Sequence, residues 1–293
     1  FSGGYADFTG ASFSRGGAGF AGAEFSGGGA KFGEAEFSGG VADFAGAEFS
    51  GGPADFEYAE FSGGDADFIG AEFSKVGASF EGAQFSDNRN SIMNFRNASF
   101  DGNASFVDAQ FTQYADFRGA RFSSSLDLTH SRFDQLEIEW NSIKEHLICD
   151  EAVYVALVKN FNDLARTDDA DDCYYEYRRE SQRNKPLGFS KIPDWIAWIS
   201  YGYGVRWQHT IGLSFVMIFL FGLFFKLGSG IQKSMYPCQQ ISQKISWPDT
   251  FYFSALAFVS QPPYNWGPRD GSWWKYVVLA ENILGWIFLT LFV

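Results

Sequence analysis

The chain has 293 residues, among them 33 glycines and 34 phenylalanines but only 8 prolines. The glycines do not recur at every third position, which excludes a collagen triple helix. The sequence has 35 acidic and 22 basic residues, which gives a formal net charge of −13. This charge disfavours a nucleic-acid binder that works by neutralising phosphates. We therefore expect neutral, basic or lipid partners and no nucleic acid.

Phenylalanines recur at alternating spacings of five and seven residues between Phe8 and Phe85, which makes a period of twelve residues. An alanine precedes each of these phenylalanines by two positions in most repeats, and a Ser-Gly-Gly-like turn closes the period, as in residues 42–52. A fixed period of this kind is typical of a solenoid, in which each repeat packs on its neighbours. We expect Phe ladders inside the coil, alanines at inward corners and glycines in the turns.

This pattern resembles the pentapeptide-repeat family, whose A-x-F/L-x-x units form a quadrilateral right-handed β-solenoid. The resemblance covers roughly residues 1–132. Alternate units carry two extra residues here, so a four-sided coil would take two full twelve-residue periods and not four plain pentapeptides. After Phe85 the rhythm slips, and it resumes from Phe95 to Phe122 at spacings near five and six.

Residues 133–191 are predicted to form a cap and a helical linker. Within them, residues 136–140 alternate like a short strand or a capping segment that closes the solenoid. Apolar residues at helical spacing in 150–165 and 168–184 predict a helix hairpin. The Asp-rich start of its second helix lacks the spacing, glycine and final glutamate of an EF-hand loop, so we expect no metal and no cofactor.

The remaining chain is predicted to be membrane-associated. The Trp-rich segment 192–207 is predicted to be an amphipathic helix at the inner membrane surface. Residues 208–293 contain two apolar stretches long enough to cross a bilayer, Ile211 to Leu227 and Trp273 to Val293. Basic residues precede the first stretch, and the positive-inside rule then places the amino-terminal part of a multi-pass cell-membrane protein in the cytoplasm. These residues are Arg178, Arg179, Arg183, Lys185, Lys191 and Arg206.

The segment 228–272 between the two stretches carries the functional pattern. Its part from Asp249 to Ser260 is apolar nearly all round but too short to cross a membrane, which is typical of a re-entrant helix. The polar, proline-rich sequence that follows should then line a water-filled path. The candidate filter residues are Val259, Ser260, Gln261, Pro262, Pro263, Tyr264 and Asn265.

Residues 251–258 are similar to the pore helix of two-transmembrane potassium-channel-like proteins, and residues 279–286 resemble their inner helix. Segments 172–179 and 194–204 resemble the linker of pentapeptide-repeat proteins fused to that pore. The resemblance implies a mixed fold: a solenoid, a helical linker and a pore module with two transmembrane helices and a re-entrant pore helix. It also implies a homotetramer, because one copy supplies a quarter of a pore wall. The implied roles are anchoring of the pore helix by Ser254 and Glu281, with Ser254 or a backbone amide as the partner of Glu281, and an inner-helix hinge at Gly285.

The family's Thr-Val-Gly-Tyr-Gly filter is replaced here by Val-Ser-Gln-Pro-Pro-Tyr-Asn-Trp-Gly at residues 259–267. Because the rings of Pro262 and Pro263 lock the backbone and restrict the residues before them, they disfavour a filter of alternately handed carbonyls. The pore helix ends near Ser260 and directs its negative dipole end inward. We therefore expect a channel with weak selectivity for cations. Its other partners are expected to be permeant inorganic ions and membrane lipid.

Two other functions are considered. One is a membrane-anchored interaction module whose solenoid is the functional part, although a tether does not need a 45-residue loop. The other is DNA mimicry, known for some soluble pentapeptide-repeat proteins, for which the membrane segments would be irrelevant. Three histidines without ligand spacing and the lack of a Ser-His-Asp or Cys-His arrangement predict no enzymatic activity. The three cysteines, Cys149, Cys173 and Cys238, are interpreted as packing residues.

Overall fold

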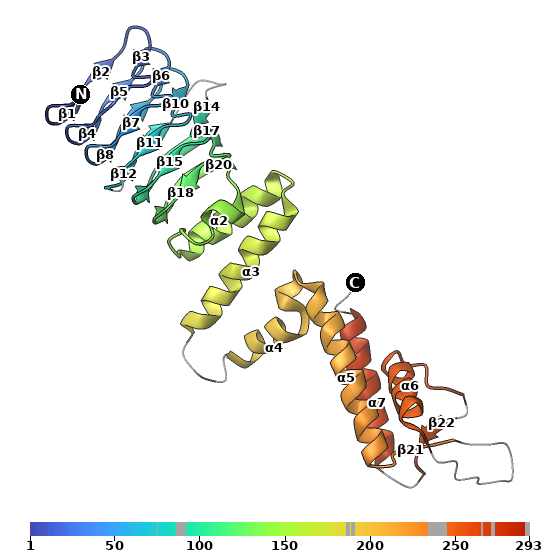
Figure 1. Ribbon diagram of the computed structural model, residues 1–293. Helices are drawn as coiled ribbons and strands as arrows, with labels where there is room; N and C mark the ends of the chain where they lie inside the picture. The colour runs from blue at the N-terminus through green and yellow to red at the C-terminus, as the bar shows by residue number, and fades with distance from the viewer. Residues whose placement is uncertain are drawn as a thin grey trace. The chain divides into compact units, whose positions relative to one another are not determined.

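The structure is a computed structural model that describes residues 1–74, 76–85, 92–185, 188, 191–233, 245–264, 266–270 and 273–290 (Figure 1). It divides into two compact units, Phe1–Tyr177 and Arg178–Val293. The first unit is a β-solenoid followed by helices, and the second consists of helices and one small hairpin.

The solenoid is built from very short parallel strands that stack on four faces. One face is the six-stranded sheet β1-β4-β8-β12-β16-β19, and another is the four-stranded sheet β7-β11-β15-β18. The other two faces belong to one ten-stranded sheet, because the longer strand β17 runs across both. The strands are β1 (Ala6–Asp7), β2 (Ser12–Phe13), β3 (Ala18–Gly19), β4 (Ala30–Lys31), β5 (Glu36–Phe37), β6 (Ala42–Asp43), β7 (Glu48–Phe49), β8 (Ala54–Asp55), β9 (Glu60–Phe61), β10 (Ala66–Asp67), β11 (Glu72–Phe73), β12 (Ala78–Ser79), β13 (Gln84–Phe85), β14 (Ile92–Asn94), β15 (Ser99–Phe100), β16 (Ala104–Ser105), β17 (Gln110–Asp116), β18 (Arg121–Phe122), β19 (Leu126–Asp127) and β20 (Arg132–Glu137).

The strand register gives the length of a coil. Ala6 is in register with Ala30, and Ala30 with Ala54, so one coil spans two twelve-residue periods in this part of the solenoid. Ala104 is in register with Leu126, so a later coil is two residues shorter. The four-sided coil of two periods that the Phe spacing implies is therefore present in the early coils, and the coil shortens where the Phe spacing shortens.

Stacked phenylalanines fill the inside of the solenoid. The rings of Phe20, Phe44 and Phe68 lie nearly parallel, with centroids 5.0 and 4.8 Å apart. Neighbouring ladders meet edge to face, as Phe44 and Phe56 do at 5.3 Å and 89°. Ring quadrupoles favour both arrangements. Ala42, two positions before Phe44, is also buried, because side chains two apart along a strand point to the same side. The predicted Phe ladders are confirmed.

The aspartates between the buried alanines and phenylalanines close corners of the coil, as three of them show. In each case a carboxylate oxygen accepts a hydrogen bond from the backbone N–H two residues later, at 2.9 to 3.0 Å. The pairs are Asp43 with Ala45, Asp55 with Glu57 and Asp67 with Ile69. Such Asx turns are local backbone devices. Part of the acidic surface is thus explained by the fold alone.

Helix α2 (Glu151–Asp163) packs on β20 and covers the carboxyl-terminal end of the solenoid. The buried side chain of Asn160 accepts a hydrogen bond from the N–H of Leu136 at 2.9 Å and donates one to its carbonyl oxygen at 2.8 Å. A further strand would form its hydrogen bonds with this N–H and this carbonyl. If both groups were buried without partners, they would lower the stability of the protein. One amide side chain therefore ends this face.

A second face ends on the segment before α2. The N–H of Leu126 donates to the carbonyl of His146, and the N–H of Ile148 donates to the carbonyl of Leu126. Residues 136–140 were predicted to be a short strand or a cap. Leu136 and Glu137 are strand residues that pair with β17, and the chain then leads into α1 (Trp140–Ile143). The two predicted linker helices are present as α2 and α3 (Thr167–Asn184).

In the second unit, α5 and α7 run side by side, and α6 packs against both (Figure 1). Among the residues that the structure describes, one helix, α5, is long and apolar enough to cross a membrane. Helix α7 covers 17 residues of the second predicted span, about 25 Å at about 1.5 Å per residue, less than a typical hydrocarbon core of about 30 Å. The elements of this unit are α4 (Lys191–Tyr201), the 3₁₀ helix η1 (Gly202–Gly204), α5 (Trp207–Leu227), β21 (Ile231–Lys233), α6 (Trp247–Phe258), β22 (Trp266–Pro268) and α7 (Trp274–Thr290).

Candidate functional site

The segment between α5 and α7 leaves and returns at the same end of the helix pair. There, β21 and β22 pair in an antiparallel hairpin. The ring centroid of Trp274, the first residue of α7, lies 6.0 Å from that of Phe225 near the end of α5. Lys226 donates to the carbonyl of Ile245 and lies 5.6 Å from the ring of Trp247, the first residue of α6. Both ends of the loop and the start of α6 therefore sit together.

The start of α6 is well defined by its sequence. The hydroxyl of Ser246 accepts from the N–H of Asp249, and the carboxylate of Asp249 accepts from the N–H of Ser246 at 3.1 Å. This capping box, with Pro248 in the first turn, satisfies helix donors that would otherwise lack partners. Lys233 on β21 adds an ion pair to Asp249 at 3.3 Å, which ties the hairpin to the helix.

From this end, α6 runs back along α5. Its middle is fixed by Ser254, whose hydroxyl donates to the carbonyl of Ile218 at 2.9 Å. Phe258, its last residue, and Val259, which follows it, share a groove of about 210 Å³ with Ile211 in the first turns of α5. Twelve helical residues thus carry the chain to the opposite half of α5.

After α6 the chain turns and comes back. Ser260 has a positive φ of 60°, and no helix follows it before α7 among the described residues. Trp266 on β22 lies against the middle of α6, with its ring 6.5 Å from Phe253 and 6.1 Å from Tyr252. The chain from Ser260 to Trp266 therefore leads from the carboxyl end of α6 back toward the hairpin. The chain thus runs along α5 as a short helix and comes back through residues that are not helical where the structure describes them.

Six of the seven predicted filter residues, 259–264, lie at the end of α6 and on this returning segment. Four of them are exposed, and Tyr264 is the most exposed at 89%. The exposed four are Val259, Gln261, Pro262 and Tyr264. Ser260 and Pro263 are half-buried, and Asn265 lies outside the described residues.

The three predicted anchoring and hinge residues lie where the helices meet. Ser254 and Glu281 are both fully buried, and the Ser254 hydroxyl is hydrogen-bonded to Oε1 of Glu281. A Cβ atom at Gly285 would collide with the carbonyl oxygen of Phe258. This close approach of α6 and α7 explains the glycine by packing, and its role as a hinge stays a prediction.

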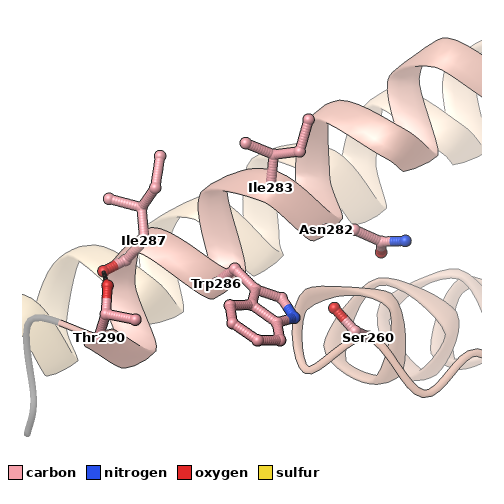
Figure 2. Close-up of a pocket in the computed structure, with 6 residues that line it drawn as sticks. All are labelled: Ser260, Asn282, Ile283, Trp286, Ile287 and Thr290. Atoms are coloured by element: carbon pink, nitrogen blue, oxygen red, sulfur yellow. Dashed lines mark hydrogen bonds between the residues drawn. The ribbon is translucent and has the colours of Figure 1, made fainter.

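One open groove of about 350 Å³ joins the returning segment to α7. Figure 2 shows Asn282 and Trp286 of α7 on the side of Ser260, at the turn after α6, and Ile283 and Ile287 pointing away from it. The lining residues are Ser260, Asn282, Ile283, Trp286, Ile287 and Thr290. The hydroxyl oxygen of Ser260 is buried without a partner among the described residues. Asn282, Trp286 and Thr290 were not singled out from the sequence, although their spacing of four residues marks one helix face.

Large apolar side chains of α5 and α7 remain exposed in the single chain. On α5 they are Phe215, Val216, Phe219, Leu220, Phe224 and Leu227, and on α7 they are Leu279, Ile283, Trp286, Ile287 and Leu289. Soluble monomers rarely expose apolar surface on this scale. Apolar faces of this kind are typical of sites that bind another protein or a membrane.

The predicted interfacial helix α4 is tied to α3 by charge. The carboxylate of Asp194 pairs with Arg178 at 3.2 Å and with Lys185 at 2.5 Å. Trp195 and Ile196 on α4 are exposed at 58% and 59%. An anchored helix with exposed apolar side chains is compatible with a position at a membrane surface.

The potential metal ligands of the described residues lie apart from one another. Within the described ranges, no group of three or more His, Cys, Asp or Glu side chains is close enough to hold a metal ion. Cys173 is buried, as expected of a packing residue, whereas Cys149 is exposed because it lies in the loop before α2. The interpretation of Cys149 as a packing residue is therefore wrong, and Cys238 lies outside the described residues.

Comparison with known proteins agrees with the solenoid. A family model described as pentapeptide repeats (9 copies) matches residues 92–134. No curated protein and no solved structure matches the chain. The chain thus contains pentapeptide repeats and folds, in its amino-terminal part, as a β-solenoid of about five turns followed by helices.

Proposed function

We propose that the chain is one subunit of a homotetrameric ion channel of the cell membrane, with the solenoid in the cytoplasm. The observation that carries this proposal is the re-entrant course of the chain from α6 to β22 beside α5 and α7. Non-helical backbone at membrane depth is tolerated only where it borders protein or lines water. The returning segment from Val259 to Asn265 is therefore proposed to line a path for inorganic ions.

The exposed surfaces support assembly from several copies. One copy leaves Val259, Tyr264 and the groove beside Trp286 open to solvent. A ring of four copies would bury these faces against each other and around one axis, while lipid covers the outer face of α5. The basic residues before α5 support the cytoplasmic position of the solenoid through the positive-inside rule.

The chemistry of the returning segment supports weak selectivity for cations. The carboxyl end of α6 lies at Phe258, so its partial negative charge faces the start of the segment. Pro262 and Pro263 hold the backbone extended, and no acidic side chain stands between residues 259 and 265. A closed ring of coordinating carbonyls is not expected from this sequence.

The direct test is reconstitution of the full chain into planar bilayers, with bi-ionic reversal potentials for potassium and sodium. We expect a cation current with a potassium-to-sodium permeability ratio within about tenfold of one. A ratio above about 100 would contradict the proposed weak selectivity. Light scattering of the detergent-solubilised protein should give a tetramer.

A cysteine experiment locates the path. In a chain with Cys149 and Cys238 replaced by serine, Gln261→Cys should lose current when a charged thiol reagent is added from the outer side. Cys173 can stay, because it is buried. Glu72→Cys, on the exposed solenoid surface, is the matched control and should keep its current under the same treatment.

The same measurements separate the alternative function. A membrane-anchored interaction module would bind to vesicles, conduct no ions and scatter light as a monomer or dimer. Such a result would transfer the function to the solenoid and leave the membrane region as a tether.

A further inference from the structure

One hydroxyl hydrogen stands between two acceptors at the centre of the helical unit. The Ser254 hydroxyl lies within hydrogen-bond distance of the carbonyl oxygen of Ile218 on α5 and of Oε1 of Glu281 on α7. A serine hydroxyl has a single hydrogen and can donate it to only one of them. If Glu281 were ionised, the Ser254 hydroxyl would supply the only hydrogen for the two contacts. The other contact would then bring two oxygen atoms together with no hydrogen between them. Both contacts are satisfied only if the carboxyl group supplies a second hydrogen.

The surroundings of Glu281 also fit a neutral acid. Its side chain is fully buried, and Oε2 has no hydrogen-bond partner among the described residues. None of the ion pairs between described residues includes Glu281. Burying an ionised carboxylate with one hydrogen bond and no counter-charge costs much free energy, whereas burying a neutral carboxylic acid costs much less.

The charged and ionisable side chains of the three helices are engaged elsewhere. On α5, His209 contacts the carbonyl of Trp198, and Lys226 donates to the carbonyl of Ile245. On α6, Asp249 pairs with Lys233, and Tyr252 is exposed. On α7, Lys275 lies over the ring of Tyr276. A proton on Glu281 itself is therefore the simplest source of the missing hydrogen.

We propose that Glu281 is a neutral carboxylic acid at neutral pH and serves as the proton-binding site of this unit. Its O–H donates to the hydroxyl oxygen of Ser254, and the Ser254 O–H donates to the carbonyl of Ile218. Each hydrogen is used once, and the relay ties α7 to α6 and α6 to α5. This relay holds three helices together whether or not the unit conducts ions.

Loss of this proton would break the relay. Hydroxide takes the proton from Glu281 and leaves water and a buried carboxylate. The carboxylate then draws the Ser254 hydrogen to itself, and Ile218 loses its donor. The new charge lies one turn from the contact between Gly285 and Phe258, where α6 and α7 touch. Alkaline pH is therefore expected to loosen α6 against its two neighbours.

The test is infrared spectroscopy of the full chain in lipid vesicles at neutral pH, in H₂O and in D₂O. We expect a carboxylic-acid C=O band that shifts to lower frequency in D₂O and disappears at alkaline pH. Glu281→Gln should lack this band, and Glu72→Gln, at an exposed position on the solenoid, should retain it. Absence of the band at neutral pH, or its full retention in Glu281→Gln, would overturn the proposal.

A second variant keeps Glu281 in place and tests the relay. In Ser254→Ala the acid loses its acceptor, so the C=O band should move to higher frequency. An unchanged band would mean that the acid does not donate to Ser254, which sinks the relay even if Glu281→Gln does not fold. A protein that shows the band but conducts no ions would leave this inference standing and refute only the proposed channel.

Discussion

Asn160 and Leu136 are joined by two hydrogen bonds that take the place of a further strand. The amide of Asn160 presents an acceptor and a donor to the backbone of Leu136, at 2.9 and 2.8 Å, inside an otherwise apolar contact between α2 and β20. Because β20 is the last strand on its face, this pair decides how that edge of the solenoid ends.

Replacement of this amide should therefore destabilise the solenoid. Asn160→Ala leaves a buried N–H and a buried C=O without partners, which we expect to lower the free energy of unfolding by about 2–4 kcal/mol. The measurement is urea unfolding followed by circular dichroism. Asn162→Ala, on the same helix but exposed, should change it by less than about 0.5 kcal/mol. Equal effects of the two variants would contradict the capping role.

The Phe ladders should carry much of the stability of the solenoid. Phe44 is fully buried between Phe20 and Phe68, so Phe44→Ala is expected to cost about 3–5 kcal/mol. Val41→Ala, at a position that is 44% exposed, should cost much less. Urea unfolding of both variants is the check, and a small effect at Phe44 would speak against ladder packing.

Charges on the solenoid faces are not arranged alike. Glu48 lies in register with Glu24 and Glu72, whereas Lys31 lies between Asp7 and Asp55. Like charges directly opposite each other destabilise a sheet, and opposite charges stabilise it, by about 0.2–1 kcal/mol.

Glu48→Gln should therefore raise the melting temperature at low salt, and Lys31→Gln should lower it. Both shifts should shrink at high salt, because these side chains are near the surface. Differential scanning calorimetry at two salt concentrations measures them. Shifts of the same sign in the two variants would show that the ladders have no electrostatic role.

The two described cysteines should differ in reactivity. Burial, with a further contribution from Asp169, raises the pKa of the Cys173 thiol to about 12, so almost none of it is thiolate at pH 8. Cys149 is exposed. In a Cys238→Ser background, iodoacetamide at pH 8 should modify Cys149 within minutes and Cys173 only in denaturant or at strongly alkaline pH. Peptide mass spectrometry is the check, and rapid modification of native Cys173 would contradict its burial.

Gly285 should not accept a side chain. The Cβ of Gly285→Ala would meet the backbone of Phe258, which cannot rotate away, so α6 and α7 would have to separate. We expect a loss of at least about 1–3 kcal/mol in the stability of this unit. Gly212→Ala on α5, where nothing lies within 4 Å, should be neutral or stabilise its helix by up to about 1 kcal/mol. Thermal unfolding in detergent compares the two, and a stable Gly285→Ala protein would refute the close packing.

The sequence by itself determined the repeating part of the molecule. The alternating spacing between Phe8 and Phe85 indicates which side chains point inward in each repeat, so the Phe ladders follow without knowledge of distant contacts. The number of residues per coil came only from the strand register. The apolar spacings likewise determined helices α2 and α3, because one face of a helix depends on neighbours three and four residues apart. The length of an apolar stretch determined α5.

Only the tertiary structure decided how the solenoid ends and how the helices of the second unit contact each other. Asn160 and Leu136 are 24 residues apart, and Ser254 stands 36 residues from Ile218 and 27 from Glu281. A single amide or hydroxyl group does not recur along the sequence at a fixed spacing, so the sequence does not indicate which residue it will bind. Its role depends on how closely two helices, or a helix and a strand edge, approach each other. The same holds for Gly285, because the oxygen atom that excludes a side chain there belongs to Phe258 on another helix.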